Sequence, residues 1–154
     1  MFADIVEPVR RLAAAVGERT VVTRWVPAPD PQGSWEAYLE AWPFAAVPES
    51  DPLLELVPEL QDLATHTVSL PTFGKWGYAL QAVTGTTPHL VLAGVSTDCC
   101  VISTALAAAD AGATITLVTD ACAGSTPENH RAALDVMALY PPQITLATTD
   151  EVLQ

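Results

Sequence analysis

The hydrophobic positions along the chain follow two spacings, one typical of strands and one typical of helices. Residues 20–26 are mostly β-branched or aromatic, and residues 90–95 form a continuous apolar run, as expected of a strand covered on both faces. Residues 67–70 and 115–119 have the same character over shorter lengths. Residues 144–148 alternate apolar with polar side chains, which predicts a strand at the edge of a sheet.

Helices are expected between these strands, where apolar residues recur every three or four positions. The first begins at Asp4, which has the capping-box spacing to Glu7, and ends at Gly17; the last begins at Thr126 and ends near Leu139. Three more are expected at 35–42, 76–83 and 98–111. Strands that alternate with helices predict an α/β protein with a three-layer α/β/α, doubly wound, Rossmann-like and mostly parallel sheet.

The first helix lacks the strand that should precede it in this architecture. A helix that leads into a strand is the second half of a β-α-β unit, in which a crossover helix joins two parallel neighbours. The helix of residues 4–17 leads into the strand of residues 20–26, and no strand pattern comes before it. We therefore expect either a sheet that lacks its first strand or an atypical β-α-β unit.

Composition indicates one globular domain with an acidic surface. Of the 154 residues, 50% are hydrophobic and 16% are charged, so the chain can bury a full core as a single domain over residues 1–154. The chain has six Lys and Arg residues and 18 Asp and Glu residues, which gives a net charge of −12. Lys75 is the only lysine. This balance argues against binding to nucleic acid or to anionic membrane surfaces, because both require basic patches.

The cysteine spacing and the targeting patterns indicate the cellular compartment in which the protein is expected. Cys99, Cys100 and Cys122 have neither a disulfide-framework spacing nor a zinc-ligand spacing. The sequence starts without a signal-peptide pattern, and no apolar run approaches the roughly 20 residues that span a bilayer. We therefore expect a protein of the reducing cytoplasm.

Candidate chemistry lies where the buried strand of residues 90–95 leads directly into a helix. Ligand sites in open α/β sheets lie at such carboxyl ends of strands. With Thr97 as N-cap, Cys100 would lie in the first helical turn, where backbone N–H groups favour a thiolate and can hold an oxyanion. The alternative is that Cys99 and Cys100 are small buried apolar residues, the commonest role of free cysteine. The chain contains no glycine-rich phosphate loop, which argues against a nucleotide-binding Rossmann protein.

The sequence around Cys100 resembles the nucleophile motif of the isochorismatase-like cysteine hydrolases. The motif reads GVSTDCCVISTA from Gly94 to Ala105. Similarity continues in residues 23–25, 71–76, 119–123 and the helix that carries His130 and Met137. The resemblance therefore covers nearly the whole chain and raises Cys100 from a candidate to the expected nucleophile.

The resemblance implies a six-stranded parallel sheet and a Cys–Asp–Lys triad. The family's nucleophile is the Cys followed by Val, which is Cys100 here and not Cys99. Its oxyanion hole uses backbone N–H groups near the Cys and near a cis peptide in the preceding turn, which by position joins Val95 to Ser96. The implied chemistry is thiolate attack on an amide, ester or related bond, with the Asp as acid and base and the Lys orienting it.

Two positions depart from the family pattern. The family's Asp lies at the end of its first strand, and Asp4 lies in the helix after that point, so it does not take this role. The family's Lys lies three residues before the aromatic residue, where this chain has Leu70, whereas Lys75 comes two residues after Phe73. A long, flexible lysine stem would let Lys75 reach the same pocket. The alternative is a solvated surface cation beside Trp76.

The absent first strand would be central in the family's sheet. Its loss would leave unpaired backbone groups in the middle of the sheet, which is costly. We therefore hypothesise that the chain is an N-terminally truncated reading of a longer gene. In-frame DNA upstream that encodes a strand ending in Asp would support this hypothesis. An upstream stop codon together with a stable product from residue 1 would refute it.

Other side chains near these loops are assigned by position. Aromatic residues in the loops that follow two strands are expected to form the walls of a substrate pocket. They are Trp25, Phe73 and Trp76, with Trp35, Tyr38 and Trp42 beside them. The alternative is that these side chains only pack within their loops. Nicotinamidase relatives bind a metal through an Asp-x-His set after the second strand. This chain has Arg24-Trp25-Val26-Pro27 there, so we expect no metal site, and we expect no cofactor. His130 is expected to be structural, and Asp120 to fix the turn after its strand.

The leading interpretation is a cysteine hydrolase that acts on a small molecule through Cys100, with Lys75 as a catalytic partner. The competing interpretation is a catalytically impaired protein that keeps the fold as a small-molecule-binding or interaction module, which the Leu70 substitution and the unassigned Asp favour. Family members are commonly dimers or tetramers, so we expect a homo-oligomer. Relatives act on isochorismate, nicotinamide, ureido compounds and other small amides, and the sequence does not choose among them.

Overall fold

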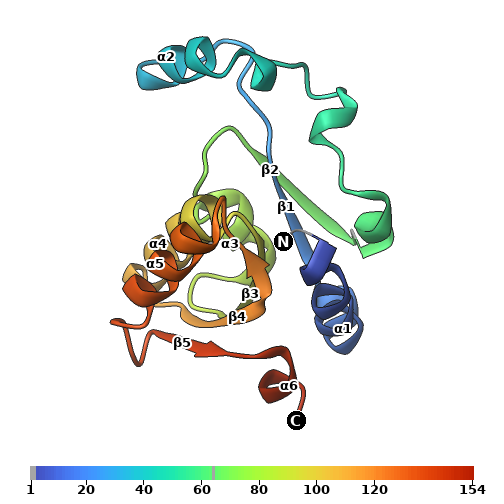
Figure 1. The fold of residues 1–154 in the computed structure, drawn as a ribbon, viewed down its shortest axis with the longest axis vertical. Helices are drawn as coiled ribbons and strands as arrows, with labels where there is room; N and C mark the ends of the chain where they lie inside the picture. Colours follow the sequence, from blue (N-terminus) through green and yellow to red (C-terminus); the bar gives the residue numbers. More distant parts are fainter. Residues whose placement is uncertain (1–2, 64) are drawn as a thin grey trace.

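The computed structural model describes residues 3–63 and 65–154 as an α/β protein (Figure 1). The five strands within these residues are β1 (Val21–Trp25), β2 (His66–Leu70), β3 (His89–Val95), β4 (Thr114–Ala123) and β5 (Ile144–Ala147). All the pairings between them are parallel. Parallel strands with interleaved helices confirm the predicted fold class, and each predicted strand is present.

Helices follow or precede the strands as the apolar spacing predicts. They are α1 (Val6–Val16), α2 (Ser34–Ala41), α3 (Tyr78–Thr84), α4 (Ile102–Asp110), α5 (Pro127–Met137) and α6 (Thr149–Val152). Thr126 caps α5, because its hydroxyl accepts a hydrogen bond from Asn129 N–H at 3.0 Å and Pro127 follows it. Gly17 ends α1 with a φ of 59°, a conformation that favours glycine.

The start of one helix and the end of one strand differ from the prediction. The helix α1 begins at Val6 with Ile5 at its N-cap position, so Asp4 does not form the expected cap, and a 3₁₀ turn (Ala3–Ile5) precedes it. The strand β4 continues to Ala123 instead of ending at Thr119. The carboxylate of Asp120 therefore does not fix a turn: it accepts hydrogen bonds from Thr149 N–H at 2.7 Å and Thr149 Oγ1 at 2.9 Å, which anchors the start of α6.

The strands pair in two sheets, not in one continuous sheet. One sheet has the order β1-β2, and the other has the order β3-β4-β5 with β5 at its edge, as predicted. The β3–β4 register shifts after Leu92, so that Gly94 pairs with Cys122 and Val95 with Ala123. Among the described residues β1 and β3 each have a single strand neighbour, which divides the sheet that the alternating pattern predicts.

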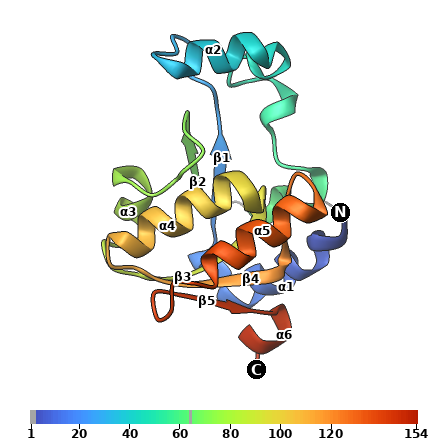
Figure 2. The same ribbon diagram turned by 60° about the vertical axis from the view of Figure 1, so that its left-hand side comes forward.

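The core lies on both faces of the three-stranded sheet. Leu117 belongs to a buried cluster with residues of α4 and α5, including Ala105 and Met137. The next residue, Val118, belongs to a second cluster with Leu12 of α1. Because successive side chains of a strand point to opposite faces, α4 and α5 cover one face and α1 covers the other. Figure 2 shows α4 and α5 on one side of β3, β4 and β5 and α6 on the other.

No helix among the described residues is long and apolar enough to cross a membrane. The longest ones, α1 and α5, each have 11 residues. Both carry charged side chains as well as apolar ones, as helices that cover a sheet do.

The substitution Leu117→Ala tests the main core. Leu117 has no exposed surface, so the variant should lose about 2–5 kcal/mol of unfolding free energy through lost burial and a cavity. The control Leu139→Ala removes the same atoms from a side chain that is 79% exposed and should change stability by less than about 0.5 kcal/mol. Urea unfolding followed by circular dichroism measures both. Equal losses would contradict the assigned core.

Candidate active site

Cys100 lies at the carboxyl end of β3, where the chain enters a π-helical turn (Thr97–Val101) that continues into α4. The N-cap of this turn is Ser96, whose carbonyl accepts hydrogen bonds from Cys99 N–H and Val101 N–H, both at 3.1 Å. Thr97 was expected as the N-cap, but it lies inside the turn and its hydroxyl is used elsewhere. Two bonds to one carbonyl therefore hold the cysteine pair at the strand end.

The backbone just before the cysteines has two special conformations. The peptide bond between Val95 and Ser96 is cis. Gly94 has a φ of 116°, in the region that favours glycine. The sequence motif places both features between the last strand residues and the helical turn, so this is the turn to which the resemblance assigns the oxyanion hole.

A network of polar side chains fixes the beginning of the helical turn. Thr97 is fully buried, and its hydroxyl lies 2.8 Å from Nδ1 of His130 in α5. Asp98 accepts hydrogen bonds from Ser125 N–H at 2.7 Å and from the Ser125 hydroxyl at 2.6 Å. Burial acts to raise the pKa of Asp98, but the Ser125 hydrogen bonds outweigh it, so this pKa lies below its usual range. Both interactions connect the turn to the segment after β4.

Gly124 lies inside this network. A Cβ built there would be 2.8 Å from Oδ1 of Asp98 and 2.8 Å from Cα of His130. Real Cβ atoms do not approach other atoms so closely, so glycine is required for the α5 start to meet the Cys100 turn. His130 therefore contacts this turn both through its backbone at Gly124 and through its hydrogen bond to Thr97.

The loop between β2 and α3 lies directly against α4. Lys75 N–H donates a hydrogen bond of 2.9 Å to Oγ1 of Thr104, and that hydroxyl donates one of 2.7 Å to the carbonyl of Cys100. A Cβ on Gly74 would lie 3.3 Å from the carbonyl oxygen of Ser103, so the loop backbone packs closely on the helix. One threonine hydroxyl therefore links the loop to the residue expected to react.

Lys75 is buried, with 3% of its surface exposed. Its ammonium donates hydrogen bonds to the carbonyl oxygens of Thr72 and, at 3.0 Å, of Phe73. Burial lowers the pKa of Lys75, whereas negative charge on Cys100 and Cys99 opposes this shift, so the ammonium lies within electrostatic range of both sulfurs. The alternative that Lys75 is a solvated surface cation is therefore wrong, because the loop buries its side chain.

The three thiols have different surroundings. Burial, the neighbouring Cys100 and Asp98 raise the pKa of Cys99 to about 12, although Lys75 opposes this rise. Burial also raises the pKa of Cys122 to about 12. Cys122 is 5% exposed, while Cys99 and Cys100 are half-buried. At neutral pH Cys99 and Cys122 are therefore protonated thiols.

Aromatic side chains from the end of β1, from α2 and from the loop after β2 gather in one group. Trp25, Trp35, Tyr38 and Phe73 form a cluster with ring centroids 4.9 to 6.2 Å apart. Burial raises the pKa of Tyr38, and charge on Cys99 and Cys100 raises it further, so the phenol lies within electrostatic range of the two thiols. We call this group the aromatic cluster.

Other residues singled out in the sequence lie away from this group. Trp76 packs against the main core cluster, and its buried Nε1 has no hydrogen-bond partner. Leu70 is the last residue of β2 and pairs with Trp25 of β1. Arg24 donates to Ser69 Oγ at 3.1 Å and is occupied between the two strands. Among the described residues no group of three or more His, Cys, Asp and Glu could hold a metal ion.

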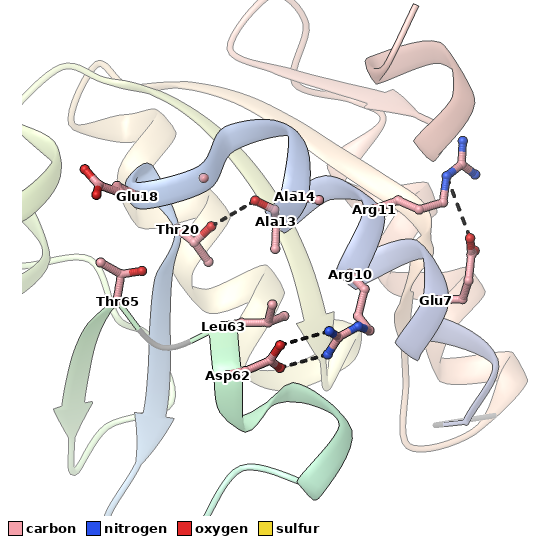
Figure 3. Close-up of a pocket in the computed structure, with 11 residues that line it drawn as sticks. Glu7, Arg10, Arg11, Ala13, Ala14, Glu18, Thr20, Asp62, Leu63 and Thr65 are labelled. Carbon is pink, nitrogen blue, oxygen red and sulfur yellow. Dashed lines mark hydrogen bonds and ion pairs between the residues drawn. The ribbon is translucent and has the colours of Figure 1, made fainter.

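Two surface hollows lie apart from Cys100. One, of about 710 Å³, lies between α1 and the 3₁₀ segment Pro58–Leu63. Figure 3 shows Arg10 beside this hollow facing Asp62, with hydrogen bonds of 2.8 and 2.9 Å. The other, of about 750 Å³, is lined by prolines of the segment after β1 and by residues of α2. Neither is lined by a cysteine, so neither defines the candidate site.

Comparison with known proteins identifies the family. The chain belongs to the Isochorismatase domain family, which it matches over residues 1–151. A comparison with curated protein sequences gives no match.

Solved structures share this fold. An isochorismatase-like hydrolase from Alkaliphilus metalliredigens superposes with a TM-score of 0.78 at 20% identity, covering 99% of this chain and 85% of that one. A cysteine hydrolase from Pseudomonas syringae gives 0.78 at 20% identity, covering 99% and 79%. N-carbamoylsarcosine amidase from Thermoplasma acidophilum gives 0.74 at 21% identity, covering 97% and 84%. At these identities the likeness establishes the fold alone.

The substitution Gly124→Ala tests the contact between α5 and the Cys100 turn. The added methyl would overlap Asp98 and His130, so we expect a loss of about 1–3 kcal/mol of unfolding free energy. The control Gly77→Ala places a methyl where no atom lies within 4 Å and should change stability by less than about 1 kcal/mol. Denaturant unfolding of both variants gives the comparison, and equal stabilities would show that the contact is not tight.

Proposed function

We propose that this protein is a cysteine hydrolase that cleaves an amide, ester or related bond of a small molecule, with Cys100 as nucleophile. The observation that carries the proposal is the position of Cys100: it lies in the turn that follows β3, and one hydroxyl, that of Thr104, joins its carbonyl to the backbone of the loop that carries the buried Lys75. Its family membership supports hydrolysis, since the similar structures include an amidase and a cysteine hydrolase.

The reaction would proceed through a covalent intermediate. The Cys100 thiolate attacks the carbonyl carbon, and the carbonyl oxygen becomes an oxyanion. Backbone N–H groups of the turn around Val95, Ser96 and the helical start would stabilise that oxyanion. The C=O bond re-forms as the bond to the leaving group breaks, and the leaving group takes a proton from water. A water molecule then attacks the thioester carbon, the C–S bond breaks, and the acid and the Cys100 sulfur are released. Lys75 would favour the thiolate by its charge.

The aromatic cluster supports a small-molecule substrate. The ring centroids of Trp25 and Phe73 are 6.1 Å apart, and Tyr38 packs edge-on against both rings. Aromatic walls with few polar groups are typical of small-molecule sites. Trp76 contributes to the core behind the site and not to this cluster.

One observation favours a second function, a binding module that retains the fold without turnover. The Lys75 ammonium is already hydrogen-bonded to carbonyl oxygens of its own loop, and Leu70 stands where relatives with the motif have the lysine. A lysine satisfied in this way stabilises the loop and does not require a catalytic role. In that case Cys100 would be no more reactive than an ordinary thiol.

Alkylation separates the two functions. The native protein is treated with iodoacetamide near pH 7.5, and each cysteine is quantified by peptide mass spectrometry. Cys99 and Cys122, both with a pKa of about 12, are internal controls that stay largely unmodified. A hydrolase predicts modification of Cys100 several-fold faster than free cysteine, with a ceiling of about tenfold, because reactivity follows the thiolate fraction and free cysteine is roughly one-tenth ionised at this pH. A rate at Cys100 equal to that of free cysteine would favour the binding module.

The substitution Lys75→Met tests the role of the buried charge. Methionine keeps much of the apolar stem and removes the ammonium, so we expect Cys100 alkylation to slow by about tenfold, the effect of roughly 1.4 kcal/mol of charge stabilisation. The matched control Arg19→Met removes an exposed cation from the turn before β1 and should leave the rate unchanged. An unchanged rate in Lys75→Met would assign Lys75 a purely structural role.

A further inference from the structure

Thr104 is a buried threonine in the first turn of α4, the helix that continues the Cys100 turn. Threonine hydroxyls in helices commonly donate a hydrogen bond to the carbonyl of the preceding turn. Thr104 donates such a bond to the Cys100 carbonyl at 2.7 Å, and Thr84 in α3 donates the same type of bond to the Leu80 carbonyl at 3.0 Å. This bond alone therefore gives Thr104 no special role.

The second hydrogen bond of the Thr104 hydroxyl distinguishes it from Thr84. Its oxygen also accepts a hydrogen bond from Lys75 N–H at 2.9 Å, so one atom joins α4 to the loop that follows β2. Thr84 makes its second bond to the carbonyl of Gly85, the next residue in the chain. Thr104 is 6% exposed and Lys75 is 3% exposed. Loss of a partner in such a buried bond is costly, because water does not replace it in place.

The loop of residues 72–75 is braced by its own hydrogen bonds. The Thr72 hydroxyl donates to the Gly74 carbonyl at 2.8 Å. The Lys75 ammonium donates back to the carbonyls of Thr72 and Phe73. A polar network whose members are satisfied in this way makes a segment rigid, so the loop is expected to move as one unit. The place at which it is anchored on α4 therefore decides where its ammonium lies.

We propose that Thr104 is a positioning residue: its hydroxyl holds the 72–75 loop on α4 and thereby sets the reactivity of the Cys100 thiol. It acts through Lys75, whose charge favours the Cys100 thiolate only at short range. Without the hydroxyl, the buried Lys75 N–H loses its acceptor, and the loop moves outward to bond this group to water. The ammonium moves with the loop. This inference rests on the proposed role of Cys100 as nucleophile.

Alkylation of Cys100 in the full chain tests the proposal. Thr104→Val keeps the β-branched shape of the side chain and removes the hydroxyl. We expect iodoacetamide to modify Cys100 about threefold or more slowly than in the native protein near pH 7.5, because less of the thiol is ionised. The ultraviolet absorbance of the thiolate should fall in parallel. Thr104→Ala is a second variant without the hydroxyl, and its residue type suits a helix better if the valine variant does not fold.

Thr104→Ser and Thr84→Val are the matched controls. Serine restores the hydroxyl, so the alkylation rate of Cys100 should return to within about twofold of the native rate. Thr84→Val removes the same atom from the same type of helical bond in α3 and should also leave the rate within about twofold of native. Rescue by serine separates the hydrogen bonds of Thr104 from the packing of its methyl group. A serine variant as slow as the valine variant would overturn the role of the hydroxyl.

A double variant tests the route through Lys75. Lys75→Met removes the ammonium, so adding Thr104→Val should slow the alkylation of Cys100 no further. A further slowing, equal to the effect of Thr104→Val in the native protein, would show that Thr104 acts directly on the Cys100 turn. That result would overturn the proposed route.

Amide hydrogen exchange follows the anchor without reference to the thiol. Lys75 N–H is bonded to Thr104, so it should exchange at least about tenfold faster in Thr104→Val and at the native rate in Thr84→Val. Equal protection of this amide in all variants would overturn the proposal.

The two measurements separate this inference from the hydrolase function. If Cys100 of the native protein reacts rapidly and its rate is unchanged in Thr104→Val, the positioning role fails and the hydrolase function stands. If native Cys100 reacts no faster than free cysteine, the hydrolase function fails, and the exchange of the Lys75 amide still decides whether Thr104 anchors the loop.

Discussion

The Thr104 hydroxyl is the interaction on which the candidate site depends. It accepts a hydrogen bond from Lys75 N–H at 2.9 Å and donates one to the Cys100 carbonyl at 2.7 Å, so it joins a loop of the two-stranded sheet to a helix of the three-stranded sheet. These sheets share no strand pairing among the described residues. The close packing of Gly74 on Ser103 and of Trp76 on the main core also holds the Lys75 loop on α4.

The three cysteines differ in the burial and in the neighbours of their thiols. Burial and neighbouring groups raise the pKa of Cys99 and of Cys122 to about 12, which makes both poor nucleophiles at neutral pH. Cys100 is adjacent to Cys99 but lies at the end of the strand, within the electrostatic range of Lys75. The same buried cation acts on both sulfurs.

Local patterns in the sequence predict the helices and strands well, because these elements depend on residues that are close together in the chain. Apolar runs predict the strands, and Thr126-Pro127 predicts the start of α5, where the threonine side chain caps the helix. The division of the sheet depends on pairing between distant residues, which no local pattern encodes. Asp120 shows the same limit: its partner is Thr149, 29 residues away. The burial of Lys75 also depends on a distant residue, Thr104, whereas the Cys100 turn is a contiguous motif and could be predicted.

The proposed hydrolase function requires that Cys100 form a covalent acyl intermediate in a site that Lys75 completes. Intact-protein mass spectrometry after mixing with a small activated ester tests it most directly. The account predicts an acyl adduct on Cys100 that forms quickly and decays as free acid is released, with no adduct in Cys100→Ser. An absent adduct, an adduct on another residue, or an adduct on Cys100 that never decays would contradict the claim.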